Sequence, residues 1–360
     1  MGTPWTRTAT GTTWSASDAA PSARYLAAMI LLLACTTPEI TPVDYAARGP
    51  HPVGHRALQV EGLRAELWYP AAEDVEGAEL VSAFTEGEQA RIYEELLETA
   101  ECASTETTSG LDAAMLEGSF PLLVFSHCHE CTRFSSFTVA ERLASHGFLV
   151  AAADHDGNTL FDGLAGAGLD LDTDTLALRV QQQHALLDAA LQIEGADAST
   201  VGAFGHSFGS VTTGMLAQER GEVRAALGLA APMENPLLPG VTVADLSRPL
   251  GFLVAIEDNS ITELGNQLIR TNFEDAGQAW KAEVADAGHW SFSDLVGLID
   301  DFEPGCGVDT RQTDGSAFTY MDPELGRSTA ATFTTAFFAE TLLRDEGALE
   351  RLGWELEVRP

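Results

Sequence analysis

Basic residues are scarce in this chain of 360 residues. It contains 54 acidic but only 19 basic side chains, among them the single lysine Lys281, and its formal net charge is −35. Such a surface repels phosphate backbones and anionic lipid headgroups. We therefore expect no nucleic acid among its partners. Because the acidic residues are spread along the chain, they indicate a solvated surface rather than an acidic tail.

Long hydrophobic runs are also missing. The apolar run at Tyr25–Leu33 has nine residues, which is too short to cross a bilayer but suits the core of a signal peptide. It follows Arg24 and ends in Leu-Leu-Ala-Cys35, which resembles a bacterial lipobox. We predict a signal segment over 1–35 and lipidation of Cys35. An exported protein of the bacterial cell envelope, in the outer membrane or periplasm, is the expectation; a plain secretory signal is the alternative.

Neither a phosphate-binding loop nor a dinucleotide fingerprint is present, and we expect no cofactor. Buried apolar strands instead alternate with amphipathic helices, which predicts an α/β fold with a mostly parallel sheet covered on both faces. The predicted strands are 57–60, 65–70, 120–125, 148–153, 201–204, 223–229, 250–256 and 280–284, and the predicted helices are 88–99, 134–145, 175–193 and 329–343.

The predicted organisation is a tether over 36–55 and one domain over 56–354, with an insertion near 71–118. Four prolines punctuate the tether, and polar loops dominate the insertion. Length and an apolar fraction of 45% provide enough material for one large core.

The stretch Gly205–Gly209 reads G-x-S-x-G and lies between a predicted strand and a helix-like run. In that context the motif indicates a nucleophile elbow, where a sharp turn exposes the hydroxyl of Ser207 above the sheet. A serine needs a base within hydrogen-bond reach, and the base needs an acid to hold its tautomer. His289 is the only histidine after Ser207.

The acid should leave the end of the intervening strand, in the order Ser, Asp or Glu, His. Asp258 fits that place, with Glu257 as a near alternative and Glu234 as a more distant one. The oxyanion needs two backbone N–H donors. We assign them to Phe208, directly after the nucleophile, and to His129, with Cys128 as second choice in the same loop.

The chain resembles exported esterases related to dienelactone hydrolase, platelet-activating-factor acetylhydrolase and bacterial polyester hydrolases. The segments that carry the resemblance, within about residues 47–340, are 49–54, 67–70, 125–127, 140–148, 154–159 and 289–292. It implies an α/β-hydrolase fold and hydrolysis of carboxylic esters without a metal.

Three positions depart from these relatives. Cys128 stands where the family usually has glycine, and Ala230 stands where the acetylhydrolase branch has its acid. Polyester hydrolases place an aromatic residue where this chain has Met233. We expect Met233 and Trp290 to contact the substrate, a small-molecule or lipid ester.

Cysteines are few, and after Cys35 four remain: Cys102, Cys128, Cys131 and Cys306. We expect a disulfide from Cys306 to Cys128 or Cys131. The alternative for 127–131, with two His and two Cys, is a zinc or copper site, but the spacing is too tight for one tetrahedral site. For Arg179 we expect a structural ion pair.

The resulting hypothesis is a serine carboxylic ester hydrolase that works through an acyl-enzyme on Ser207. A non-catalytic binding lipoprotein on the same fold and an acyltransferase with the same triad are the alternatives.

Overall fold

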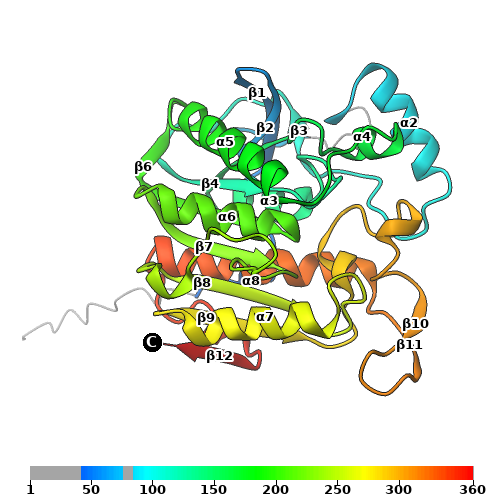
Figure 1. Ribbon diagram of the computed structural model, residues 1–360. Coiled ribbons are helices and arrows are strands. Elements are labelled where there is room, and N and C mark those ends of the chain that lie inside the picture. The colour runs from blue at the N-terminus through cyan, green and yellow to red at the C-terminus, as the bar shows by residue number, and fades with distance from the viewer. Residues whose placement is uncertain (1–41, 76–83, 360) are drawn as a thin grey trace, which may run out of the picture. The chain divides into compact units, whose positions relative to one another are not determined.

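The computed structural model describes residues 42–75 and 84–359. Its centre is a ten-stranded sheet in the order β12-β9-β8-β7-β6-β4-β5-β2-β1-β3 (Figure 1). The strands are β1 (Val53–Val60), β2 (Leu63–Pro70), β3 (Gly110–Leu111), β4 (Phe120–Ser126), β5 (Leu149–Ala153), β6 (Ala196–His206), β7 (Val223–Leu229), β8 (Leu250–Ala255), β9 (Ala279–Val284) and β12 (Leu356–Arg359). The six from β9 to β5 are parallel, and β2 and β12 pair antiparallel at either side.

Helices cover both faces of this sheet. The helices are α2 (Gly87–Leu97), α3 (Phe137–Ser145), α4 (Leu160–Leu164), α5 (Thr173–Ala190), α6 (Phe208–Glu219), α7 (Thr262–Asp275) and α8 (Pro323–Leu342). In Figure 1, α5, α6 and α7 lie in front of the sheet and α8 lies behind it. Helix α3 packs against α8. This arrangement confirms the predicted α/β architecture.

The side-chain alternation of β4 explains the two layers. Successive residues of a strand point to opposite faces. Leu123 and Phe125 join the apolar cluster of α3 and α8, whereas Leu122 and Val124 join that of α5, α6 and α7. All four are at most 2% exposed. A strand buried on both faces is continuously apolar, which is the pattern that made β4 recognisable.

The carboxyl ends of the parallel strands β4, β6, β8 and β9 meet at one edge of the sheet because the strands run in the same direction. Ligands of open α/β sheets bind outside these ends. The loops that follow these strands at that edge carry the candidate oxyanion loop after β4, the serine after β6, the acid after β8 and the histidine after β9.

The domain boundaries differ from those predicted. Tyr45 is buried and donates its hydroxyl to Asp345 at 2.6 Å, and the N–H of Gly49 donates to Ser145 Oγ at 2.9 Å. The segment predicted as a tether over 36–55 is therefore packed from Tyr45 onward, and the compact unit runs from Val43 past the expected end at 354. Residues 1–41, with the predicted signal segment and Cys35, lie outside the described residues.

Several elements were not predicted. Helix α7 fills a span in which no element was expected, α8 begins at Pro323 instead of 329, and α3 begins at Phe137 instead of 134. The hairpin of β10 (Val308–Thr310) and β11 (Ala317–Thr319) is also new. Over the described ranges, none of the helices combines the length and apolarity that crossing a membrane requires.

Candidate active site

Ser207 lies on a sharp turn between β6 and α6. Its backbone has φ 55° and ψ −124°, a conformation that is strained for a residue with a side chain. Glycines allow this turn: a Cβ at Gly209 would lie 1.9 Å from the carbonyl oxygen of Ser126, and one at Gly205 would lie 2.1 Å from that of Gly209. The G-x-S-x-G pattern is therefore a packing requirement, and it presents Ser207, which is partly exposed, at the edge of the sheet.

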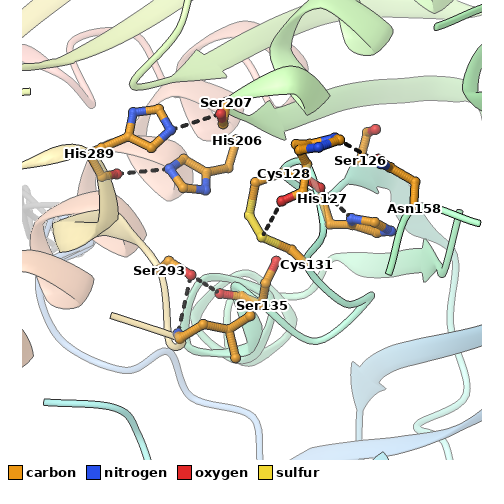
Figure 2. The surroundings of a disulfide bond; sticks show 12 residues. Ser126, His127, Cys128, Cys131, Ser135, Asn158, His206, Ser207, His289 and Ser293 are labelled. Carbon is orange, nitrogen blue, oxygen red and sulfur yellow. Dashed lines mark hydrogen bonds between the residues drawn. A yellow bond between two sulfur atoms is a disulfide. The ribbon is translucent and has the colours of Figure 1, made fainter. Parts of the chain in front are cut away.

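His289 connects Ser207 to Asp258. Its Nε2 lies 2.8 Å from Ser207 Oγ, and its Nδ1 lies 2.7 Å from Asp258 Oδ2. Figure 2 shows the ring directed at the serine. The other carboxylate oxygen of Asp258 accepts the N–H groups of Ser260 and Ile261, at 3.0 and 2.9 Å. These bonds fix the buried carboxylate, so the three side chains have the arrangement of a nucleophile, a base and an orienting acid.

The two alternative acids have other partners. Glu257 forms an ion pair with Arg311 at 2.6 Å and accepts the N–H of Gln312. Glu234 accepts the N–H of Val243 at 2.7 Å. The structure brings Asp258, and neither of these glutamates, into contact with His289.

His206 is a site residue that the sequence analysis missed. It is fully buried, and its Nε2 lies 2.9 Å from the carbonyl oxygen of His289. Burial, together with the neighbouring His289, lowers the pKa of His206 to about 3. The ring is therefore neutral at ordinary pH, and Nε2–H donates to that carbonyl. The residue before the nucleophile thus holds the backbone of the base (Figure 2).

The two expected oxyanion donors lie in adjacent segments. Phe208 is the first residue of α6, where a helix leaves its N–H groups without intrahelical partners. His129 lies in the loop after β4, and its ring contacts that of Phe208 with centroids 6.1 Å apart. Asn158 Nδ2 donates to His129 Nδ1 at 2.8 Å. Burial and the charge of Arg179 lower the pKa of His129, so this ring is neutral as well.

The same loop contains a disulfide between Cys128 and Cys131, both of which are fully buried (Figure 2). Glu130 between them has φ 51°, and the two Cα atoms lie 5.3 Å apart. The expected bridge from Cys306 to this loop is wrong, because Cys306 pairs with Cys102. The bond also takes up both thiols that a zinc or copper site would need. The described residues contain no group of three His, Cys, Asp or Glu side chains able to hold a metal.

The two expected substrate contacts have different outcomes. Met233 is fully buried in the apolar cluster on the α6 side of the sheet, together with Val241, and does not face an open site. That expectation does not agree with the structure, because Met233 packs against α6 beside Gly214. Trp290 is only 6% exposed and packs its ring on Phe302 and against His289, with centroids 4.0 and 5.3 Å away. Trp290 therefore packs between Phe302 and the His289 ring, and contact with the substrate remains a prediction.

A mostly parallel sheet, a serine at a strand-to-helix elbow, and an acid and a histidine after later strands together define the α/β-hydrolase fold with a serine triad. The family model described as "Platelet-activating factor acetylhydrolase, isoform II" matches residues 55–161. That match ends before the nucleophile, so the triad is identified by its geometry.

The fold is similar to the solved structure of a ferulic acid esterase from Streptomyces cinnamoneus. The TM-score is 0.65 and the identity 18%, with 89% of this chain and 100% of the other covered. A search of curated proteins found no significant match. At this identity the structural similarity defines the fold.

Proposed function

We propose that this protein is a serine carboxylic ester hydrolase that forms an acyl-enzyme on Ser207. The observation that carries the proposal is the continuous contact from Ser207 through His289 to Asp258, at 2.8 and 2.7 Å. The family and structural similarities to esterases support the same reaction class. The substrate class is a small-molecule or lipid ester.

In the first half-reaction, His289 Nε2 takes the proton of Ser207 as the oxygen attacks the ester carbonyl. The N–H groups of Phe208 and His129 hold the resulting oxyanion, and Asp258 stabilises the imidazolium. His289 then gives the proton to the leaving alcohol. In the second half-reaction, His289 activates a water that releases the acid and frees Ser207.

The acid position distinguishes this site from that of the resembling acetylhydrolases. Ala230 stands at the end of β7, where that branch places its acid, and it is fully buried with φ 50°. An alanine has no carboxylate, so the acid comes from the loop after β8. We therefore propose ester hydrolysis without assigning platelet-activating factor as the substrate.

Labelling with a fluorophosphonate probe and hydrolysis of p-nitrophenyl acetate test the proposal together. We expect the probe to be attached to Ser207, as peptide mass spectrometry would show, and Ser207→Ala to lose labelling. Its kcat should fall by about 10⁶-fold, as when a triad serine is removed. A variant that hydrolyses the ester like the parent would contradict the mechanism.

Two alternatives are outcomes of the same work. Absence of labelling and turnover in the parent protein would favour a binding protein on this fold. Transfer of the acyl group to an added alcohol in preference to water, measured by product analysis, would favour an acyltransferase.

We also propose export and a lipid anchor at Cys35, in the outer membrane or periplasm. The apolar run before Cys35 supports this, and so do two disulfides, which form in oxidising compartments. Metabolic labelling with a palmitate analogue tests it. Labelling that persists in Cys35→Ser would contradict the anchor.

A further inference from the structure

Arg179 of α5 is a fully buried side chain with contacts on both sides of the oxyanion site. Its guanidinium donates to the carbonyl oxygens of His127 and Cys128, to Ser126 Oγ, to Asn158 Oδ1 and to Thr212 Oγ1. The distances to Cys128, Ser126 and Thr212 are each 3.3 Å. One side chain thus links the loop after β4 to helix α6.

These acceptors are all neutral. The structural ion pair expected for Arg179 is wrong, since each of its contacts among the described residues is with a carbonyl, hydroxyl, amide or ring. Burying a charge without a counter-charge is costly, and buried charges are normally paired. An arginine nevertheless stays protonated in proteins. The oxyanion loop therefore rests on a positive charge that no carboxylate of the described residues neutralises.

The neighbouring histidines add no further charge to that of Arg179. Burial first and the charge of Arg179 second lower the pKa of His127, His129 and His155. All three rings are consequently neutral at neutral pH. Arg179 remains the only cation in this group of contacting residues. Before an oxyanion forms, none of these residues supplies a negative charge to balance it.

The guanidinium contacts the peptide group of one proposed N–H donor and the side chain of the other. The Cys128 carbonyl that accepts from Arg179 belongs to the same peptide group as the N–H of His129. A hydrogen bond to the oxygen of a peptide group polarises the group and makes its N–H a stronger donor. On the other side, the guanidinium lies 4.5 Å from the centre of the Phe208 ring. Asn158 accepts from Arg179 and donates to the ring of His129.

We propose that Arg179 is a positioning residue of the oxyanion hole, which aligns and polarises the Cys128–His129 peptide and supplies the positive charge that the tetrahedral oxyanion neutralises. The inference rests on the proposed ester hydrolysis. Arg179 does not touch the substrate; it acts through the peptide groups that do.

The test compares two ligands with the same acyl chain in the full protein. A trifluoromethyl ketone adds to Ser207 and forms an oxyanion, whereas the matching secondary alcohol binds without forming one. For Arg179→Met we expect the ketone Ki to rise by about 10²-fold, the scale of losing one oxyanion donor. The Ki of the alcohol and KM should stay near the parent values while kcat falls. Arg179→Lys keeps the charge but not the planar fork, so its ketone Ki should rise less.

Leu186→Ala is the matched control, because Leu186 lies two turns further along the same helix and is fully buried in the core. It should lower Tm without changing the ratio of the ketone Ki to the alcohol Ki. An unchanged ratio in Arg179→Met would overturn the proposal and leave a structural role. If that variant does not fold, an unchanged ratio in Arg179→Lys would overturn it. A parent protein that forms no ketone adduct would overturn both this inference and the ester hydrolase proposal.

Discussion

Two adjacent acids show how closely side-chain direction determines function at the scale of single residues. Asp258 points to His289, and Glu257 points to Arg311. Both carboxylates are at most 2% exposed, so burial does not distinguish them. The difference is the direction in which each leaves the loop after β8, and this makes one a part of the triad and the other an anchor for the β10–β11 segment.

This pair gives a sharp prediction. Asp258→Asn should keep the fold but lower kcat by about 10⁴-fold, because the amide holds the wrong tautomer of His289. Glu257→Gln should leave kcat essentially unchanged and lower the free energy of unfolding by about 1 kcal/mol through the weakened Arg311 contact. Steady-state kinetics and urea titration of both variants check this. If Glu257→Gln lost more activity than Asp258→Asn, the acid would be misassigned.

Site residues that a motif or their order along the chain marks could be predicted from the sequence. Site residues without such a mark could not. Ser207 follows from a motif, Asp258 from a strand end and His289 from being the only histidine after Ser207, and the structure brings them into contact. His206 and Arg179 act as buried partners of backbone carbonyls, and such a contact leaves no pattern in the sequence. Met233 was misplaced because the course of a loop depends on tertiary packing.

Two disulfides constrain the site at the scale of loops. The bond from Cys128 to Cys131 closes a turn of the oxyanion loop, whereas the bond from Cys102 to Cys306 spans 204 residues. Cys306 lies just after Pro304, whose carbonyl accepts the N–H of Trp290. The long-range bond therefore ties the insertion to the segment that carries the base.

Removing the long-range bond should mainly affect stability, whereas removing the short one should mainly affect turnover. Removing the long-range bond with Cys102→Ser and Cys306→Ser should cost about 2–4 kcal/mol, since the stabilisation grows with the enclosed loop. Removing the short one with Cys128→Ser and Cys131→Ser should cost less, but it should lower kcat by about tenfold through displacement of the His129 N–H. Urea titrations measure the stability of the two double variants, and p-nitrophenyl acetate kinetics measure their kcat. Each double variant is the control for the other. An unchanged kcat in the second would show that Arg179 and Asn158 hold the loop without the disulfide.

The sheet was more predictable than the elements at its edges. Strands β4, β5 and β8 are buried on both faces, and their continuous apolar runs identify them. Helix α7 and the strands β10, β11 and β12 are short or half-exposed, so their composition resembles that of loops. The disulfide pairing depended on where these loops lie, which explains why it was predicted wrongly.

The distribution of charge determines how the whole molecule responds to pH. Acidic side chains dominate the composition, but just below pH 6.5 the fully buried His127, His155 and His206 are the groups that bind protons in the unfolded chain and not in the folded one. Burial lowers the pKa of each, to about 3 for His206. In the unfolded chain they would titrate near pH 6.5.

Below pH 6.5 the unfolded state therefore binds more protons than the folded state, and stability is lost as the pH falls. Each histidine should contribute up to about 1.4 kcal/mol per pH unit. Between pH 6.5 and 5.5 most carboxylates remain ionised, so the histidines dominate the change. We expect the urea midpoint to fall steadily from pH 7.5 to 5.5. A midpoint that is flat or rises over this range would contradict the neutral burial of these rings.

Single substitutions assign the slope of stability against pH to particular histidine rings. His155→Gln removes one buried ring whose nitrogens contact Ser126 and Gln182, and it should reduce the slope by about one proton's share, roughly 1.4 kcal/mol per pH unit. His184→Gln is the control, because it removes a histidine that lies at the surface beside Glu219 and not in the core. Equal slopes in the two variants would mean that the proton uptake on unfolding comes from groups other than His155.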